Sequence, residues 1–557
     1  MAVANSIPDE AAELADQFPD EVDVDEAEIA ERFSMLVDEY RVPKDEAVRT
    51  TRNYFLDAYG LEYDDLDGQS GSSGPADERE IATVEGPNEW LSVTAKVVRT
   101  AMDRRGEFAC SNDDLNQVQH NAVWGLAGNA HSIPEDCPQR DERFGWTGDA
   151  QIAARSLAFN FDAARFHEKW ARDHDDAASD LGYAPDVIPN KAPENPGDPT
   201  WTITRVVIPW YRYRHDGDER ILEEQFEGMR AHVEYWLSVT KDDLVPGAYG
   251  KFGDWLAFEN TNGRRGLPYD LFTTAFVYQI TDVLAKIADV LDNEADAARY
   301  REWADRLRTA FNEEFFEPAA GRHRPGTQAS YAVPLFLGLV PEDHVETVAA
   351  GLAEKVRSDG GKLKTGFLGT RPLIQTLAEH GYDDLAYEVV SQPERPGWVY
   401  MARNGATTMW ERWNSDDSIG SGMNSLNHSP LTHVSEYFYE VLAGIKIGDR
   451  PVTDHVTIAP SLVEDLEWVE ASYETRNGEM AVDWERTDGG YDLSVRVPWN
   501  TSATIRLPDA AGRSVSESGV DLSVEATPTR EGARSIDRED DVVVLAVEAG
   551  QFDFSVR

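Results

Sequence analysis

The sequence predicts a mainly α-helical protein that ends in a β-sandwich and begins with a small helical segment. Two patterns carry this prediction. Between residues 106 and 447, apolar residues recur at helical spacing in long segments joined by loops rich in Trp, Asp, Asn and Gly. Between residues 448 and 557, short alternating apolar runs are separated by turn residues at intervals of about ten residues. Helical hairpins arranged as a bundle, solenoid or toroid fit the first pattern, and an antiparallel sandwich fits the second.

The first 105 residues read as three short pieces. Apolar residues at helical spacing between residues 28 and 59 predict a small helical segment within residues 1–66. Residues 67–80, DGQSGSSGPADERE, have no apolar face and predict a flexible linker. Residues 90–98, WLSVTAKVV, predict a strand without a partner nearby, so residues 81–105 are interpreted as an orphan strand and a junction.

About a dozen helices are expected over residues 106–447, and several are well marked. The clearest segments are residues 149–174, 218–240, 268–291, 343–356, 371–381 and 433–445. In the C-terminal part, the clearest strands are residues 455–460, 480–487, 491–499, 502–508, 542–547 and 552–557. The boundary between the two parts is therefore placed between residues 447 and 448.

Charge and composition exclude several classes of partner. Lys and Arg total 52 against 103 Asp and Glu, a formal net charge of -51, which is typical of a halophilic protein because molar salt screens the self-repulsion. Such a field opposes binding to nucleic acids and to anionic membranes, and it favours a neutral ligand. With two cysteines, Cys110 and Cys137, a disulfide scaffold is excluded. No leader or membrane-spanning run is recognised, so a cytoplasmic protein is expected.

Five loop clusters carry the chemistry. They read DCPQRDERFGWTGD (136–149), FGDWLA (252–257), GFLGTRP (366–372), GWVYMARNGATTMWERWNS (397–415) and GMNSLNH (422–428). Each combines glycine and polar groups, most with aromatic rings, a composition that suits sugars because C–H faces pack on rings while hydroxyls bond to carboxylates, amides and imidazoles. Hydrolysis of a glycosidic bond requires two carboxyl groups. Glu142 and Glu411 are candidates on distant loops.

These five clusters, together with DAQIAARSLAFNFD after the first, resemble in order the catalytic domain of the glycoside hydrolase family 78 α-L-rhamnosidases from about Gly106 to Ile447. The resemblance implies an (α/α)6 six-hairpin barrel with an active site at one open end, followed by a C-terminal β-sandwich. It implies hydrolytic removal of terminal non-reducing α-L-rhamnose with inversion. The implied reaction requires no cofactor or metal.

The resemblance also implies roles for individual residues. Glu142 becomes the general acid and Glu411 the general base that activates water, so their carboxyl groups should stand about 6.5–9.5 Å apart. Other residues of the clusters become substrate-binding residues: Asp136, Trp146, Asp149 and His428 as ligands of the rhamnose, Asp254 beside them, and Trp255, Trp398 and Trp410 as walls.

Two features of the motifs need separate attention. Neighbouring carboxylates such as Asp136 should raise the pKa of Glu142, whereas Arg140 and Arg143 would lower it. We therefore predict that both arginines turn away or pair with structural carboxylates, and a strongly depressed pKa of Glu142 would count against its acid role. In WTITRVVIPW, Ile203 stands where family members often carry Asp, which puts a substrate contact in doubt.

Each candidate also has a structural alternative. Glu411 could form an ion pair with Arg412 or Arg403, Asp136 could cap a helix, Cys137 could be a small buried filler and His428 could be a core histidine. At least two of the five tryptophans Trp146, Trp255, Trp398, Trp410 and Trp413 are expected only to fill a core. A metal is not predicted, because His120, His131, His428 and His433 show no ligand spacing with a carboxylate partner.

The first hundred residues resemble the start of a haloarchaeal replication protein A-like single-strand binding protein, on FSMLVDEYRVPKDEAVRTTRNYFLDAYG and GPNEWLSVTAKVV, and a fusion near residues 99–105 is the simplest interpretation. Three functions are therefore compared. They are an inverting α-L-rhamnosidase, a catalytically impaired carbohydrate-binding protein left by truncation or fusion, and a single-strand nucleic-acid binder opposed by the net charge. The oligomeric state is left open.

Overall fold

The computed structural model describes residues 97–190, 196–258, 260–261, 264–265, 269–418, 425–510, 512–522, 533–539 and 541–557. The chain divides into two compact units, 1–99 and 100–557, and the second contains nearly all of the described residues. The predictions for residues 1–66, 67–80 and most of 81–105 lie outside the described residues. Val97 and Val98, the end of the predicted orphan strand, are described and form no strand.

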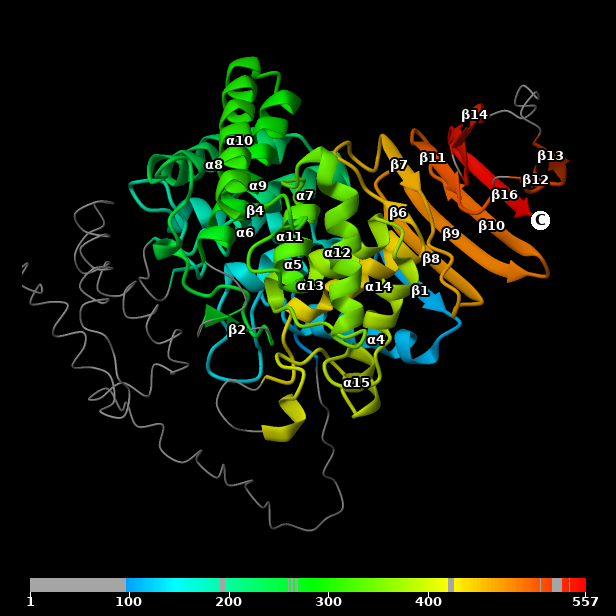
Figure 1. Ribbon diagram of the computed structural model, residues 1–557, viewed down its shortest axis with the longest axis horizontal. Helices are drawn as coiled ribbons and strands as arrows, with labels where there is room; N and C mark the ends of the chain where they lie inside the picture. Colours follow the sequence, from blue (N-terminus) through cyan, green and yellow to red (C-terminus); the bar gives the residue numbers. More distant parts are fainter. Residues whose placement is uncertain are drawn as a thin grey trace, which may run out of the picture. The chain divides into compact units, whose positions relative to one another are not determined.

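The helical part of the second unit consists of long helices connected as hairpins (Figure 1). The helices are α4 (Asp113–Gly128), α5 (Thr147–Asn160), α6 (Ala164–Ala177), α7 (Thr204–Asp216), α8 (Arg220–Ser238), α9 (Tyr269–Val290), α10 (Glu294–Phe315), α11 (Gln328–Phe336), α12 (Val345–Ser358), α13 (Phe367–Glu379), α14 (Asp383–Val390), α15 (Trp398–Arg403) and α16 (Val434–Tyr437). All six helical segments singled out from the sequence contain helix. The segment 149–174 is interrupted at residues 161–163, between α5 and α6, and the segment 433–445 contains the short α16 followed by a π-helical turn, Phe438–Leu442.

Burial alternates along the helices and separates an inner from an outer layer. Every residue of α5 is buried, and α7, α11 and α13 are buried over nearly their whole length. The helices between them, α6, α8, α10, α12 and α14, bury one face and expose charged residues on the other. Inner helices packed inside outer ones are the arrangement of the predicted barrel of helical hairpins.

Helix α9 is long and apolar enough to cross a membrane by length and composition. In this structure 83% of its apolar window is buried inside the protein, among the other helices. Its apolar character is therefore used for packing between helices.

The C-terminal part forms two packed sheets. One has the strand order β1-β8-β9-β10-β16-β12-β13 and the other β14-β15-β11-β7-β6. The bounds are β1 (Gly106–Cys110), β6 (Ile445–Lys446), β7 (His455–Ile458), β8 (Trp468–Thr475), β9 (Gly478–Thr487), β10 (Gly490–Val497), β11 (Ser502–Leu507), β12 (Val515–Glu517), β13 (Val520–Asp521), β14 (Ala533–Glu539), β15 (Val542–Val547) and β16 (Gly550–Val556). Short hairpins β2–β3 (Asn260–Thr261, Arg264–Arg265) and β4–β5 (Phe316–Glu317, Arg322–His323) lie between helices.

One boundary of the sandwich is corrected, and the predicted antiparallel pairing is confirmed except at one pair of strands. Residues 106–110 were assigned to the barrel, but they form β1, which pairs along its length with β8 at the edge of the larger sheet. The sandwich is not purely antiparallel, because β7 and β11 pair in parallel over four residues. The alternation of Gly106, Phe108 and Cys110 toward the core explains why five residues far from the other strands join this sheet.

Candidate active site

The loop that precedes α5 is closed on itself by its first acidic residue. Phe144 donates its backbone N–H to Asp136 Oδ1 at 2.8 Å, and Asp136 donates its own N–H to the carbonyl of Phe144 at 2.9 Å. At Gly145 an added Cβ would lie 2.0 Å from the carbonyl oxygen of Ile188, so glycine is required there by the close approach of a neighbouring loop. The closed loop fixes the direction in which Glu142 leaves the backbone.

The two carboxylates predicted for catalysis meet at one guanidinium group. Arg140 Nη2 lies 2.6 Å from Glu142 Oε2 and 3.7 Å from Glu411 Oε2. These two oxygens are therefore no further apart than about 6.3 Å, the sum of the two distances, so in the ligand-free protein they are closer than the predicted 6.5–9.5 Å. Glu411 is 2% exposed and accepts the backbone N–H of Ser425 at 3.0 Å.

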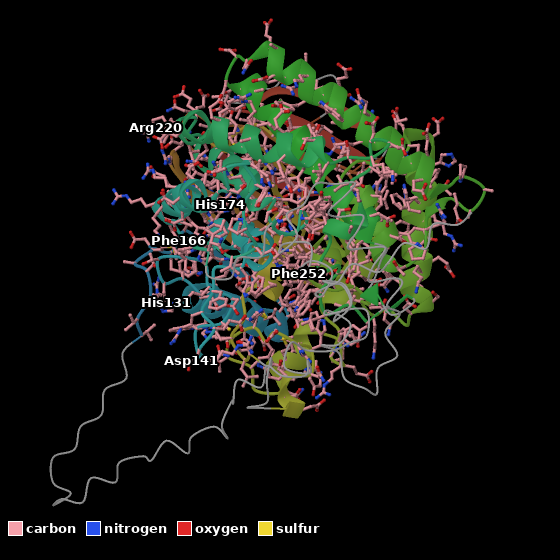
Figure 2. The ribbon with its side chains drawn as sticks, turned by 90° about the vertical axis from the view of Figure 1, so that its left-hand side faces the viewer. His131, Asp141, Phe166, His174, Arg220 and Phe252 are labelled. Carbon is pink, nitrogen blue, oxygen red and sulfur yellow. The ribbon has the colours of Figure 1, made fainter. Side chains whose placement is uncertain are left out.

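The prediction that both arginines turn away from Glu142 is half wrong. Arg143 does turn away, pairing with Asp141 at the exposed edge of the loop (Figure 2). Arg140 instead pairs with Glu142, which also accepts the indole N–H of Trp146 at 3.0 Å. Burial favours the protonated form of Glu142, but Arg140 and Trp146 outweigh it and hold the pKa of Glu142 below its ordinary value. In the ligand-free protein, Glu142 is therefore an ionised carboxylate.

Asp136, unlike Glu142, has a raised pKa. Its side chain is 1% exposed, and burial, together with the charges of Glu142 and Asp149, raises its pKa to about 7 despite the opposing charge of His428. Cys137 donates its thiol hydrogen to Asp136 Oδ2 at 2.7 Å and lies 3.6 Å from Glu142 Oε2. The thiol predicted to be a buried filler therefore connects the two carboxyl groups, and Asp136 is partly protonated near neutral pH.

His428 faces the carboxylates and is not a simple core histidine. Its Nε2 lies 3.0 Å from Asp149 Oδ1, and Asp149 is in the first turn of α5. Burial opposes a charge on the ring, but Glu411, Asp149 and Asp136 raise the pKa of His428 to about 9. The imidazolium therefore offsets part of the negative charge of the cluster at neutral pH.

Aromatic rings separate into a half-buried group at the site and a buried group behind it. Trp146 packs edge-to-face on Phe252, with ring centroids 5.5 Å apart, and Phe252 contacts both Trp201 and Trp255. Trp146, Phe252 and Trp255 are half-buried, which leaves ring surface for a ligand. Phe252, near the centre of the view in Figure 2, was quoted in its motif but was not predicted as a site residue.

The assignment of Trp398 and Trp410 as walls is corrected. Trp398 is fully buried, donates its indole N–H to the carbonyl of Leu431 and packs edge-to-face on Trp413. Trp410 is 4% exposed. The expectation that at least two tryptophans only fill a core is thus confirmed. The sequence could not show which two, because the spacing of aromatic residues does not distinguish a cleft from a core.

The role predicted for Asp254 is also corrected. It caps a helix and is not a substrate ligand. Its side chain is fully buried, and Oδ2 and Oδ1 accept the backbone N–H groups of Gly366 and Gly369 at 2.7 and 2.9 Å, at the start of α13. A Cβ at Gly366 would lie 2.2 Å from the carbonyl oxygen of Trp255 and 2.4 Å from that of Asp254. A Cβ at Gly369 would lie 2.8 Å from Asp254 Oδ2. The glycines of GFLG are therefore explained by this cap.

We expect Asp254→Asn to lower the free energy of unfolding by about 1–3 kcal/mol, because a charged acceptor of two buried N–H groups is lost. Chemical denaturation in constant salt measures this change. KM for a sugar substrate should stay within about twofold of that of the unchanged chain. A large rise in KM at unchanged stability would restore Asp254 as a ligand.

Ile203, the departure noted in the sequence, is fully buried at the start of α7. Its carbonyl accepts the N–H groups of Val206 and Val207, as the first turn of a helix requires. Its side chain is enclosed by the protein, so it adds no surface to the site.

One donor set for a metal exists among the described residues. The ligand atoms of Asp136, Cys137 and His428 lie within 4.8 Å of one another. The guanidinium of Arg140 donates to Cys137 Sγ at 3.1 Å, however, and a fixed positive charge beside the sulfur opposes a second cation. The sequence could not foresee this set, because its members come from two loops.

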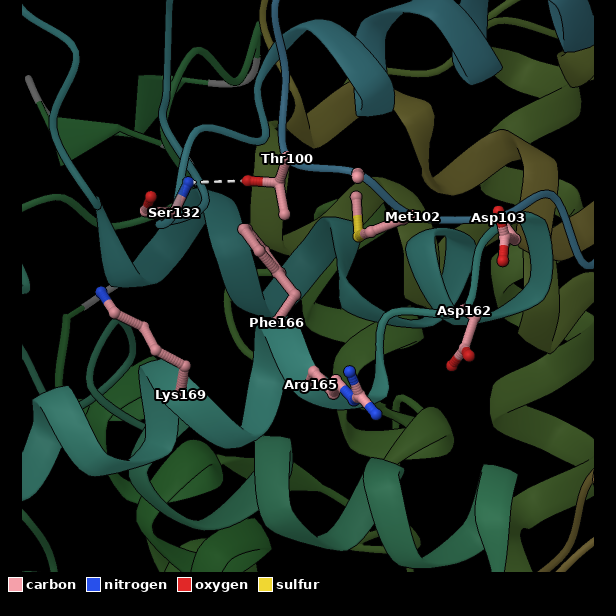
Figure 3. Close-up of a pocket in the computed structure, with 9 residues that line it drawn as sticks. Thr100, Met102, Asp103, Ser132, Asp162, Arg165, Phe166 and Lys169 are labelled. Atoms are coloured by element: carbon pink, nitrogen blue, oxygen red, sulfur yellow. Dashed lines mark hydrogen bonds between the residues drawn. The ribbon is translucent and has the colours of Figure 1, made fainter.

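One hollow of the helical part lies away from these residues. It has a volume of about 540 Å³ and is lined by residues 100–103 and by Ser132, Asp162, Arg165, Phe166 and Lys169 (Figure 3). Ser132 donates its N–H to Thr100 Oγ1 across its rim at 2.8 Å. No carboxylate of the Glu142–Glu411 cluster lines this hollow, so its size does not make it the candidate active site.

Comparisons with known proteins give matches over most of the second unit. The bacterial α-L-rhamnosidase six-hairpin glycosidase domain matches residues 103–442, and the bacterial α-L-rhamnosidase C-terminal domain matches residues 444–521. A curated α-L-rhamnosidase of Formosa agariphila is 34% identical over 459 residues, which cover 81% of this chain and 48% of the relative.

Solved structures give the same result. An α-L-rhamnosidase of Dictyoglomus thermophilum matches with a TM-score of 0.77 and 35% identity over 83% of this chain and 51% of its own. The Streptomyces avermitilis α-L-rhamnosidase, solved with L-rhamnose, matches with a TM-score of 0.75 and 30% identity over 82% and 43%. The chain thus spans about half the length of these relatives. The chain belongs to the bacterial α-L-rhamnosidase family of six-hairpin glycosidases.

Proposed function

We propose that the protein removes terminal α-L-rhamnose from rhamnosides by hydrolysis with inversion. The observation that carries this proposal is the meeting of Glu142 and Glu411, from loops far apart in the sequence, at Arg140 Nη2. Glu411 is the general base that takes a proton from water, and Glu142 donates a proton to the leaving oxygen. The rhamnose complex of the Streptomyces avermitilis relative supports rhamnose as the sugar.

The residues around the pair have separate roles in this proposal. Asp149, Asp136 and His428 bind sugar hydroxyls, and Trp146 and Trp255 pack on the sugar faces. Glu142 has a side chain 29% exposed and can reach a leaving group, whereas the enclosed Asp136 cannot. Asp136 instead carries part of a proton near neutral pH in the free protein and is linked to Glu142 through Cys137.

Arg140 must leave Glu142 before the acid step. It lies between the two carboxylates, in the space that the reacting centre and the water need. When a sugar displaces it, the pKa of Glu142 rises, because burial and neighbouring negative charge then act without the opposing guanidinium. Sugar binding and protonation of the acid are thus coupled.

Arg140→Gln tests this coupling. A general acid must be protonated, so kcat/KM falls as pH rises through its pKa in the free enzyme. Removing the guanidinium raises that pKa, and we expect the falling limb of the kcat/KM profile to move to higher pH by about one unit. Arg143→Gln, in the same loop but paired with exposed Asp141, should leave the limb unchanged. Equal profiles for all three proteins would contradict the role given to Arg140.

The proposed substrate is tested with p-nitrophenyl glycosides in molar salt, because we propose from the net charge of -51 that the protein is halophilic. We expect turnover of the α-L-rhamnoside and at least a hundredfold lower kcat/KM for the α-L-fucoside and the β-D-glucoside. A folded chain that binds rhamnose without turnover would favour the impaired carbohydrate-binding protein. Preference for another glycoside would contradict the substrate.

A further inference from the structure

The proposed base lies on a short segment of chain that is paired with another segment. Glu411 donates its backbone N–H to the carbonyl of Ser425 at 2.9 Å, and His428 donates its N–H to the carbonyl of Met409 at 2.9 Å. The two segments therefore run side by side in opposite directions, although neither belongs to a helix or a strand. The backbone at the base is fixed by the segment that begins at Ser425.

Ser425 also holds the side chain of the base. Its backbone N–H donates to Glu411 Oε2 at 3.0 Å, so the carboxylate accepts from the same residue that pairs with its backbone. Glu411 is 2% exposed and Ser425 is fully buried. A buried carboxylate with a charge-assisted bond to a backbone N–H has little freedom to rotate. The place of the Glu411 carboxylate therefore depends on the place of Ser425.

The hydroxyl group of Ser425 makes three hydrogen bonds. It donates to the carbonyl of Asn427 at 2.8 Å, accepts the backbone N–H of Asn427 at 3.1 Å and accepts from Gln139 Nε2 at 2.8 Å. A hydroxyl has one hydrogen to donate and two lone pairs that accept, so its whole capacity is used. Two of the bonds shape the segment that carries Ser425, and the third leaves it.

The third bond reaches the loop of the proposed acid. Gln139 stands three residues before Glu142, in the closed loop described above. Its bond to Ser425 Oγ therefore connects the loop of the acid with the segment that holds the base, across 286 residues of sequence. Arg140 makes a second connection, since its guanidinium contacts both carboxylates. The bond from Gln139 differs because it joins two neutral groups.

Asn427 anchors the other side of the segment to helix α4. Its Oδ1 accepts from Asn129 Nδ2 at 2.8 Å, and Asn129 follows the last residue of that helix. An added Cβ at Gly128 would lie 2.6 Å from Asn427 Nδ2, so this side chain packs directly on the helix. The segment 425–428 is thus bonded to the barrel on one side and to the loop of the acid on the other.

The two carboxylates differ in how firmly they are held. The side chain of Glu142 is 29% exposed, and its contacts are with the side chains of Arg140 and Trp146. Glu411 is enclosed and bonded to a backbone N–H. Their Oε2 atoms are at most about 6.3 Å apart, the sum of 2.6 and 3.7 Å, whereas an inverting pair needs about 6.5–9.5 Å. Because Glu411 is the fixed member, movement of Glu142 supplies the increase.

We propose that Ser425 is a positioning residue for the general base and that the Gln139–Ser425 bond sets the distance between the base and the loop of the acid. This role rests on the proposed function, because it takes Glu411 as the base. When a sugar displaces Arg140, Glu142 turns toward the leaving oxygen while Glu411 keeps its place behind the water. The Gln139–Ser425 bond contains no charged group, so it remains when the guanidinium leaves.

Gln139→Met tests this bond without disturbing the core. Gln139 is exposed, and methionine has a side chain of similar length with no N–H to donate. We expect kcat for α-L-rhamnosides in molar salt to fall about tenfold and KM to stay within about twofold, because a misplaced base slows the attack of water while the sugar contacts remain. The loss should be equal for nitrophenyl and alkyl leaving groups.

Gln117→Met is the matched control. Gln117 is an exposed glutamine of α4 whose amide also donates to a neutral side chain, Asn121 Oδ1, at 2.9 Å. This variant should keep both kcat and KM. A loss of kcat in Gln117→Met equal to that in Gln139→Met would show a general effect of losing a surface amide and would overturn the proposal.

Ser425→Ala removes the other partner of the same bond and leaves the backbone N–H that holds Glu411. If the two side chains act through one bond, the double variant with Gln139→Met should lose no more kcat than Ser425→Ala alone, because neighbours that share an interaction are not additive. Losses that multiply in the double variant, or an unchanged kcat in Gln139→Met, would overturn the proposal.

Amide hydrogen exchange of the full chain gives a readout without turnover. The backbone N–H groups of Ser425, Asn427 and His428 are all bonded, to Glu411 Oε2, Ser425 Oγ and the carbonyl of Met409. In Gln139→Met we expect exchange over residues 425–428 to become about tenfold faster while exchange in α10 stays the same, because opening is local. Gln117→Met should change neither.

Unchanged exchange over residues 425–428 in Gln139→Met would overturn the positioning role at any level of activity. Faster exchange there, in a chain that hydrolyses no rhamnoside, would count against the proposed hydrolysis and leave the Gln139–Ser425 bond supported. Failure of the positioning role is therefore distinct from failure of the proposed function.

Discussion

Glu411→Gln is expected to lower kcat for every α-L-rhamnoside by about 10³-fold or more, because water is no longer deprotonated as it attacks. Glu142→Gln should differ in its dependence on the leaving group. A nitrophenolate leaves without much help from an acid, whereas an alkyl or sugar alcohol does not. We therefore expect a small loss with the p-nitrophenyl glycoside and a loss of about 10³-fold with an alkyl rhamnoside or a rhamnosyl disaccharide.

Asp141→Asn is the matched control for these variants. Asp141 lies next to Glu142 in the same loop, but its side chain is 93% exposed and pairs with Arg143. Its substitution should leave kcat within about twofold. If Glu142→Gln and Glu411→Gln lost activity equally on all leaving groups, Glu142 would not be the acid.

Glu436→Gln should destabilise the protein more than any other single change named here. Glu436, on α16, is fully buried and pairs with Arg155 of α5 at 2.6 Å and Arg371 of α13 at 2.7 Å. Removing its charge leaves two buried guanidinium groups with too little negative charge. We expect the free energy of unfolding to fall by about 3–5 kcal/mol, measured by denaturant unfolding at constant salt.

The pH dependence of Glu436 has a definite sign. Burial opposes its charge, but Arg155 and Arg371 lower its pKa to about 2, below the ordinary glutamate value of about 4.3. Its contribution to stability is therefore complete above about pH 4.3 and is lost as pH falls toward 2. Glu227→Gln, which removes a 76% exposed partner of Arg230, should cost less than about 1 kcal/mol. A similar cost for both variants would contradict the role of the buried network.

This network also supports the site. Arg155 lies on the same helix as Asp149, and Glu436 follows His428 after one short loop and turn. Helix α5, which carries Asp149, and helix α16, which follows the loop of His428, are therefore fixed to each other by buried ion pairs. Glu440 joins the same network through Arg155, and burial raises its pKa to about 7.

Much of the fold followed from periodicity, because amphipathic helices and alternating strands bury apolar residues at different spacing. Strand β1 could not be predicted in its place, because its partner β8 lies more than 300 residues away and nothing local indicates the pairing. The inner helices were also harder to delimit than the outer ones, since α5 is buried on all sides and has no polar face.

The sequence predicted most of the residues that meet at the candidate site, but not the directions in which their side chains point. The motif that contains Glu142 and Asp136 could be recognised from the sequence, but the orientation of Arg140 could not, because a loop residue has no periodicity that fixes where its side chain points. The same reason explains the errors at Asp254 and Trp398, whose residue types suit both a sugar site and a buried cap or core.

The anomeric form of the first product tests the central claim most directly. Hydrolysis of an α-L-rhamnoside by the intact chain in molar salt can be followed by proton NMR before the released sugar mutarotates. The account predicts that β-L-rhamnose appears first and the α-anomer grows later, because water activated by Glu411 attacks the face opposite to the leaving group. Initial release of α-L-rhamnose, or no rhamnose from a folded chain, would contradict it.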